Sequence, residues 1–163
     1  RLLSVPGPGP ARRRNAGGAA ARAPLLLFLD DDMAPETGLL TAHVRAHAAG
    51  SGPRVGIGYL PPGNDTGGDW LKAQLRDWWE DVFVEMVRPG HRFCYTDVMS
   101  GNLSLPTALF LAIGGFQLPT TCREDYELGY RLLLAGAELV FCADARSLHE
   151  DKTDLHKLLG RKR

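Results

Sequence analysis

The stretch LLLFLDDD, residues 25–32, decides the fold that the sequence predicts. Its first five residues are all apolar, which is typical of a strand buried on both faces of a parallel sheet. Three aspartates follow this strand directly, at its carboxyl end, where open α/β sheets bind their ligands. The segment therefore predicts an α/β domain with a ligand site at the end of a buried strand.

Helical and extended segments alternate on both sides of this strand. Apolar spacing, capping residues and glycine stops predict helices over residues 11–23, 36–49, 69–87 and 124–135, with a short one from Pro106 to near Gly114. Short apolar runs predict further strands over residues 54–60, 94–99 and 137–142. Strands that alternate with helices favour a mostly parallel sheet flanked by helices.

The net charge of zero conceals two basic ends and an acidic middle. Residues 1–29 hold five arginines and no acid, and residues 152–163 hold five basic residues and one acid. The remaining nine basic and eighteen acidic residues lie in 30–151, which therefore carries a net charge of −9. This distribution disfavours a nucleic-acid-binding core. It fits a cation site or, equally, a solvated acidic surface.

The sequence indicates neither a membrane span nor a disulfide framework. No apolar run approaches the ~18 residues that a span needs. The cysteines Cys94, Cys122 and Cys142 are odd in number and lack the paired spacing of a zinc site. We therefore expect a reduced, cytoplasmic protein whose basic tail makes at most peripheral contact with the inner membrane surface.

Two acidic groups are candidates for chemistry. Neighbouring carboxylates repel one another, so the aspartates at 30–32 are most easily explained by a bound divalent cation, magnesium or manganese. The alternative is a solvated turn that caps the next helix. At a later helix start, Asp125 could take a proton from an attacking hydroxyl. Glu124 and Asp125 could equally serve only to cap that helix.

Several motifs follow one another in a fixed order and spacing. RNAG occupies 14–17, and Arg14 precedes Asp30 of FLDDD by sixteen residues. SGNLSL at 100–105 is followed by GGF at 114–116, and REDYELGYRL occupies 123–132. Over about residues 12–150, this pattern resembles the RNxG, DxD, acceptor-side and ED motifs of family-2 glycosyltransferases.

The resemblance implies a GT-A fold, which is Rossmann-like with a mostly parallel sheet. It implies transfer of a sugar from a nucleotide-sugar donor to a hydroxyl of an unidentified acceptor, which could be a glycan, a lipid or a small molecule. A Mn²⁺ or Mg²⁺ ion would neutralise charge on the leaving nucleoside diphosphate. Asp125 would be the general base of a single displacement with inversion.

The same resemblance assigns the other site residues. The donor side would comprise Arg14, Asn15, Asp30, Asp31 and Asp32. The pocket between donor sugar and acceptor would comprise Gly101, Asn102 and Glu124. The metal ligands would be Asp32, Asp30 and His149.

The family's nucleobase-binding segment is expected before residue 1. We therefore expect a Pro/Gly/Arg-rich lead-in with part of a nucleotide-binding helix (1–24), a catalytic core (25–150) and a basic C-terminal helix or tail (151–163). The competing hypothesis is a truncated or degenerate, non-catalytic domain of this fold that binds a cation or a partner. A nucleotidyltransferase is disfavoured because it would leave the helix at 123–132 unexplained.

Two further groups have ordinary structural interpretations. His43 and His47 have the i, i+4 spacing of some zinc sites but lack the intervening glutamate of HExxH, so we expect them on a solvated helix face. We expect the tryptophans to contribute to the core or to the wall of an acceptor cleft; they are Trp70, Trp78 and Trp79.

Overall fold

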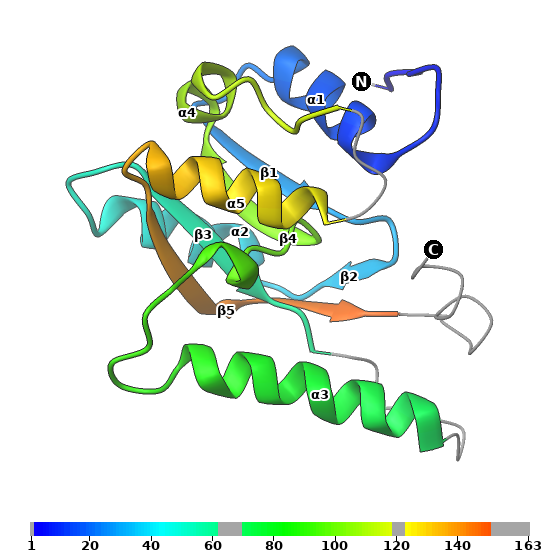
Figure 1. Cartoon of the computed structure of the whole chain (residues 1–163), viewed down its shortest axis with the longest axis vertical. Coiled ribbons are helices and arrows are strands. Elements are labelled where there is room, and N and C mark those ends of the chain that lie inside the picture. The colour runs from blue at the N-terminus through cyan, green and yellow to red at the C-terminus, as the bar shows by residue number, and fades with distance from the viewer. Residues whose placement is uncertain (1, 62–69, 119–122, 151–163) are drawn as a thin grey trace.

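The computed structural model describes residues 2–61, 70–118 and 123–150 (Figure 1). The helical elements are α1 (Pro10–Ala20), α2 (Leu39–Ala48), α3 (Trp70–Met86), the 3-10 turn η1 (Tyr95–Asp97), α4 (Thr107–Ala112) and α5 (Glu124–Leu134). The strands are β1 (Leu25–Leu29), β2 (Met33–Pro35), β3 (Arg54–Tyr59), β4 (Asn102–Pro106) and β5 (Glu138–His149). The helix or tail predicted over 151–163 lies outside the described residues.

The five strands form a mixed sheet in the order β1-β4-β3-β5-β2. β4 runs antiparallel to both of its neighbours, β1 and β3, and β2 runs antiparallel to β5. Within the described part of the chain, β3 and β5 are the one parallel pair. The prediction of a mostly parallel, Rossmann-like GT-A sheet is therefore wrong. The sheet is mostly antiparallel and curls nearly into a barrel.

The segment between β3 and β4 accounts for this difference. Parallel strands need a crossover connection packed across the sheet, whereas α3 lies beyond the sheet (Figure 1). The strand predicted over 94–99 is also absent, because the Asp97 carboxylate accepts a hydrogen bond from the Cys94 N–H at 2.8 Å. Such local bonds stabilise a turn in competition with strand pairing. The chain therefore turns at η1 and returns antiparallel as β4.

β1 has the predicted boundaries but lies at an edge of the sheet. Leu26 and Phe28 point into the core and are 7% and 8% exposed, while Leu29 is 36% exposed. Only one face of the apolar run is thus deeply buried. The expectation of a strand buried on both faces of a parallel sheet is wrong.

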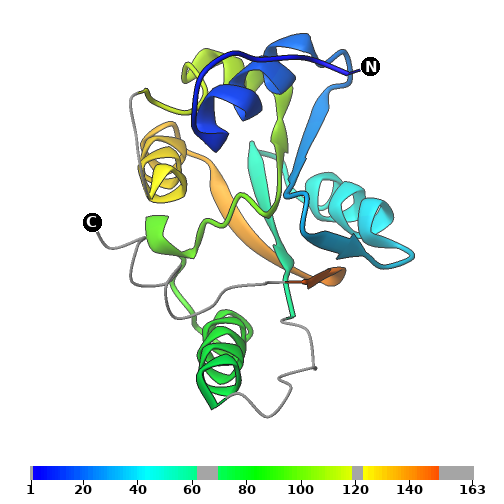
Figure 2. The same ribbon diagram turned by 90° about the vertical axis from the view of Figure 1, so that its right-hand side faces the viewer.

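Helices cover both faces of the sheet. α1, α4 and α5 lie on one face and α2 on the other, as the two perpendicular views show (Figures 1 and 2). The helices predicted over 36–49, 69–87 and 124–135 are confirmed as α2, α3 and α5, each shortened by one or more residues. The core lies between the sheet and the helices on the face that carries α5.

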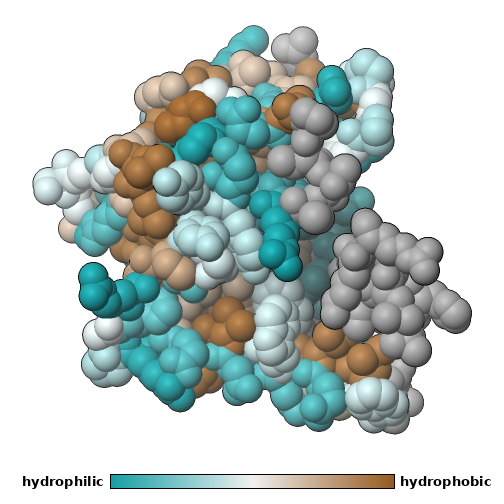
Figure 3. All heavy atoms as spheres, viewed as in Figure 1, coloured by the Kyte–Doolittle hydropathy of each residue, from teal (hydrophilic) through white to brown (hydrophobic). Residues whose placement is uncertain are grey.

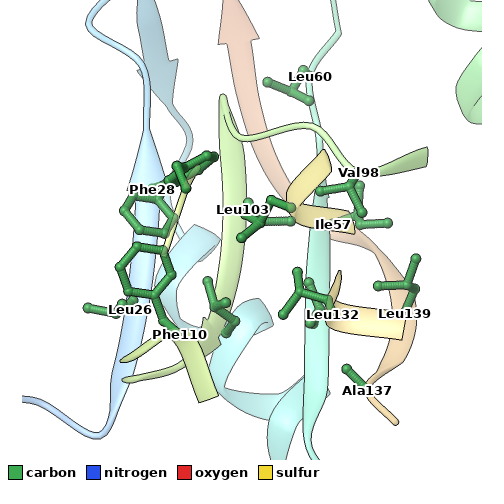
Figure 4. Close-up of a cluster of buried hydrophobic side chains, with 14 of the residues drawn as sticks. Leu26, Phe28, Ile57, Leu60, Val98, Leu103, Phe110, Leu132, Ala137 and Leu139 are labelled. Carbon is green, nitrogen blue, oxygen red and sulfur yellow. The ribbon is translucent and has the colours of Figure 1, made fainter. Parts of the chain in front are cut away.

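Aromatic and branched side chains fill this core (Figure 4). The ring of Phe28 lies 5.2 Å from that of Phe110 and 5.5 Å from that of Phe116, measured between centroids. Ile57 and Leu103 from the central strands are fully buried against this cluster. Burial of each such side chain contributes about 1.5–3 kcal/mol, so this layer supplies much of the stabilisation.

The surface is mixed in character. On the face shown in Figure 3, apolar residues form separate small groups among polar ones. In the described ranges, no helix has the length and apolarity that crossing a membrane requires.

Candidate functional site

Arg14 joins three segments that are distant in sequence. From α1 its guanidinium donates to Asp30 Oδ1 at 2.5 Å, just after β1, and to Glu124 Oε1 at 3.1 Å, in the first turn of α5. Its side chain is 13% exposed, and that of Glu124 is 15% exposed. Burial lowers the pKa of Arg14, but the bond to Asp30 and the negative charges of Asp30, Asp125 and Glu124 outweigh it, so the net shift is upward.

Asp125 lies beside this ion-pair cluster and is held by Ser100. Its Oδ1 accepts the Ser100 hydroxyl at 2.7 Å, and its Oδ2 accepts the Ser100 backbone N–H at 3.3 Å. Burial raises the pKa of the Asp125 carboxyl, while the bonds from Ser100 and the charge of Arg14 oppose the rise. The result is a carboxylate of fixed orientation and increased basicity.

The acids at this helix start are more than caps. The residue before the helix, Arg123, has a left-handed backbone (φ 59), and its own side chain makes no capping hydrogen bond. Glu124 and Asp125 direct their carboxylates to Arg14 and Ser100 instead. The helix dipole still favours both charges.

Gly101 brings β4 close to the end of β1. Its carbonyl accepts the Asp30 N–H at 3.2 Å. A Cβ at this position would lie 3.3 Å from Asp30 Oδ2 and 3.2 Å from the side chains of Leu60 and Met33. The close approach therefore favours glycine, and it fixes Asp30 next to Gly101, whose neighbour Ser100 bonds to Asp125.

Asp32 and His149 form a second pair at the far end of the aspartate segment. Asp32 Oδ2 lies 3.5 Å from His149 Nε2, and the two side chains are 47% and 19% exposed. The pairing of β2 with β5 fixes them, because Met33 lies opposite His149 and the Glu150 N–H donates to the Asp32 carbonyl at 2.9 Å. The pair is geometrically fixed and open to solvent.

Of the other predicted site residues, Asn15 and Asn102 bond to other parts of the protein, and Asp31 is exposed. The Asn15 amide is fully engaged with the backbone of Phe116, donating to its carbonyl and accepting its N–H, both at 2.8 Å. Asn102 is buried and points to the opposite face of the sheet, toward α2. Asp31 is exposed in the turn between β1 and β2. The structure thus brings together Arg14, Asp30, Gly101, Glu124 and Asp125, with Asp32 and His149 adjacent.

Metal binding rests on few donors. Within residues 2–61, 70–118 and 123–150, no group of three or more His, Cys, Asp or Glu side chains forms a metal-binding cluster. Of the three predicted metal ligands, Asp30 is paired with Arg14, which leaves Asp32 and His149. The carboxylate suits Mn²⁺ or Mg²⁺, and Mg²⁺ characteristically takes one or two carboxylates and completes its shell with water and phosphate.

A buried polar network lies on the opposite face, where sequence analysis expected a solvated helix. His43 is 1% exposed; its Nε2 is 2.8 Å from Asn102 Oδ1 and its Nδ1 is 2.8 Å from Ser104 Oγ. The Ser104 hydroxyl is also 2.8 Å from His47 Nε2. The expectation of a solvated face is wrong for His43.

The network has one consistent set of protons. Asn102 donates from Nδ2 to the carbonyls of Ala145 and Tyr59, so its Oδ1 must accept from His43 Nε2. In neutral His43, Nδ1 then accepts from the Ser104 hydroxyl, and Ser104 Oγ accepts from His47 Nε2. A charge on His43 would break this arrangement.

Ser100 and the buried network around His43 were not predicted as such, although the sequence carries a signal for each. Ser100 stands directly before Gly101 in a predicted site motif, yet it received no role. His43 and His47 share a helix face, as Asn102 and Ser104 share a strand face, and two matched polar pairs indicate mutual contact. Arg131 was also missed: it donates to the carbonyls of Ile113 and Gly115, both at 2.6 Å.

The tryptophans divide between surface and core. Trp70 and Trp78 are 74% and 56% exposed, whereas Trp79 stacks on Phe83 with centroids 6.1 Å apart. The Trp79 ring also lies 6.5 Å from that of His149, edge to face. One of the three therefore borders the candidate site.

The chain matches no family model, and a search of curated proteins finds none that is similar.

Proposed function

We propose that this domain transfers a sugar from a nucleotide-sugar donor to an acceptor hydroxyl. One observation carries the proposal: residues from the four motifs, up to 110 positions apart, meet around Arg14 and Asp125. The proposal does not rest on a GT-A sheet, which this molecule lacks. It rests on the chemistry that the assembled side chains offer.

Asp125 acts as the general base in this proposal. Its carboxylate is partly buried, this burial raises its pKa, and Ser100 orients both oxygens. A carboxylate with a raised pKa accepts a proton from an attacking hydroxyl more readily than an ordinary one. The hydroxyl oxygen then attacks the sugar's anomeric carbon as the bond from that carbon to the nucleoside diphosphate oxygen breaks, so the nucleoside diphosphate leaves in a single displacement with inversion.

Arg14 fixes the acidic residues around the base. It bridges Asp30 and Glu124 and so offsets the charge that would otherwise accumulate beside Asp125. Gly101 lets the segment before β4 pack closely against Asp30, while Ser100 beside it bonds to Asp125. Arg14 and Ser100 thereby hold the base and its acidic neighbours in fixed positions.

Asp32 and His149 are the residues that would hold a Mn²⁺ or Mg²⁺ ion. When bound, that ion would neutralise the charge of the leaving nucleoside diphosphate. Asp32 is the more exposed of the two, and its carbonyl is fixed by the Glu150 N–H.

A non-catalytic domain is the second candidate, and a specific observation favours it. Asp30, the first residue of the DxD pattern, is committed to Arg14. In that case the cluster would stabilise the domain, and Asp32 and His149 would bind a cation or a partner without turnover.

The proposed setting is the cytoplasm, with at most peripheral membrane contact. Both cysteines in the described ranges, Cys94 and Cys142, carry free thiols, as a reducing compartment would keep them. The proposed partners are a nucleotide-sugar and a hydroxyl acceptor, not nucleic acid.

Calorimetric titration with uridine and guanosine diphosphates, with and without Mn²⁺, tests the donor site. We expect Mn²⁺-dependent binding of one nucleotide, and at least about tenfold weaker binding in Asp32→Asn because a metal ligand loses its charge. Asp77→Asn is the matched control: Asp77 is exposed on α3 and pairs with its neighbour Arg76.

Two outcomes would overturn the donor site. One is a folded wild-type chain that binds neither nucleotide with Mn²⁺. The other is an Asp32→Asn variant that binds as tightly as Asp77→Asn.

A further inference from the structure

β1 presents an unpaired edge. Just beyond the two ends of β1, the Asp30 N–H donates to the Gly101 carbonyl and the Pro24 carbonyl accepts the Thr107 N–H. Both bonds join β1 to the side on which β4 lies. In an antiparallel pair such bonds alternate along the strand, so Leu26 and Phe28 also face β4. The N–H and C=O groups of Leu25, Leu27 and Leu29 therefore point away from the sheet. Among the described residues, no strand pairs with that side.

An apolar groove runs beside this edge. It measures about 490 Å³ and lies between β1 and the first turn of α2; its lining includes Leu27, Leu29, Pro35, Leu39 and Leu40. α2 lies over the central strands and leaves the outer part of β1 uncovered (Figure 2). Along α2, Leu40 and Val44 continue the apolar surface and are 66% and 57% exposed.

The edge lacks the features that usually prevent pairing. Natural edge strands carry charges, a proline or a bulge that discourages association. β1 is five apolar residues without charge, proline or bulge. An exposed strand of this composition readily pairs with another strand.

We propose that β1 pairs with β1 of a second copy of this chain, antiparallel, across a two-fold axis at Leu27. The outward-facing groups allow this register, because they occur at 25, 27 and 29 and are symmetric about Leu27. Leu27 then lies opposite Leu27 of the second copy, and Leu25 opposite Leu29. All three positions make pairs of backbone hydrogen bonds, as an isologous interface requires.

Charge complementarity favours a second copy over another occupant. Arg22 is exposed before β1, and Asp31 is exposed after it. In the proposed register, Arg22 of one copy lies beside the segment of Asp31 and Asp32 in the other, and symmetry repeats the contact. The interface is thus apolar at its centre and oppositely charged at both ends. The proposal does not depend on the proposed activity.

Sedimentation of the whole chain tests the proposal from about 1 to about 100 µM, the range that spans moderate dimer affinities. We expect wild type to reach twice the mass of 17.8 kDa. Leu27→Lys places two like charges at the axis and should remain monomeric. Leu134→Lys, the same change at an exposed leucine on α5, should dimerise as wild type does.

Amide hydrogen exchange shows whether this edge forms the interface. We expect the amides of Leu25, Leu27 and Leu29 to gain protection as concentration rises, while those of Leu26 and Phe28 are protected at every concentration. Arg22→Glu should weaken the dimer several-fold, and Arg22→Glu with Asp31→Lys should restore it, because both contacts regain opposite charges.

The proposal is overturned if wild type remains monomeric at every concentration tested. This holds also if a different protein, and not a second copy, occupies the groove. It is also overturned if the chain dimerises while the Leu27 amide stays unprotected. The proposal is likewise overturned if Leu27→Lys dimerises with the same affinity as wild type.

Discussion

His43 illustrates how one side chain joins two elements. Its two ring nitrogens contact Asn102 and Ser104 on β4, so α2 is tied to the sheet by hydrogen bonds as well as by apolar contact. Burial lowers the pKa of His43. Burial also lowers the pKa of His47, and the positive charges of a protonated His43 and of Arg54 add to that effect. The folded chain therefore favours the neutral form of both imidazoles.

Stability should consequently fall in mild acid. A histidine whose pKa in the folded chain lies below its unfolded value of 6.5 makes its full contribution to stability at pH values above 6.5. The contribution is lost as pH falls through 6.5 toward the folded pKa, because the unfolded state binds the proton more readily. We expect the free energy of unfolding, measured by urea titration, to decrease between pH 8 and pH 5. His43→Gln should flatten this dependence, and a dependence equal in both proteins would contradict the assignment.

At the residue scale, the charged residues of the candidate site were easier to predict than the hydrogen-bond partners of the polar residues around them. The motifs identified Arg14, Asp30 and Asp125, which the structure brings together. They also assigned the amide of Asn15 to the donor, although both of its polar atoms are bonded to Phe116. A motif records which residue types occur, whereas the partner of each polar atom depends on which segments meet in space.

At the element scale, local signals identified most helices and strands. The helix at α5 was evident from its acidic first turn and from Gly136 beyond its end. The strand at β1 was evident from its apolar run. β2 was not predicted, because three residues carry too little periodicity and form a strand only by pairing with the end of β5.

Two neighbouring glycines in α1 have opposite roles. Gly17 is exposed, and a Cβ there would meet nothing within 4 Å. Gly18 is buried, and a Cβ there would overlap the ring of Phe110. The sequence alone treats both as residues that weaken the helix.

The pair provides a matched test of how α1 packs. Gly17→Ala should raise the free energy of unfolding by about 0.4–1 kcal/mol, because alanine restricts the unfolded chain. Gly18→Ala should lower it by about 1–3 kcal/mol, because the core must shift. Chemical unfolding measures both, and equal effects of the two substitutions would show that α1 does not pack on Phe110 as described.

At the scale of the whole molecule, strand direction could not be predicted from the sequence. Periodicity reports which side chains are buried and is the same for a strand that runs either way. The direction of β4 follows from where α3 lies and from the turn at η1, and both depend on tertiary contacts. The predicted alternation of strands and helices was therefore compatible with a sheet that is mostly antiparallel.

The mostly antiparallel sheet nevertheless assembles the predicted acids. β4 returns beside β1, so Ser100 and Gly101 lie next to Asp30, and α5 adds Glu124 and Asp125 on the same face. The central claim is that this assembly catalyses glycosyl transfer with Asp125 as base.

The most direct test measures nucleoside diphosphate release from a panel of nucleotide sugars, with mixed hydroxyl acceptors, by wild type and by Asp125→Asn. Asparagine keeps the size of the side chain and can still accept from Ser100, but it cannot take up the hydroxyl proton. We expect release to fall about 10²–10⁴-fold while nucleotide binding and unfolding stay close to wild type. Release by Asp125→Asn at the wild-type rate, or no release by wild type from any donor that it binds, would contradict the account.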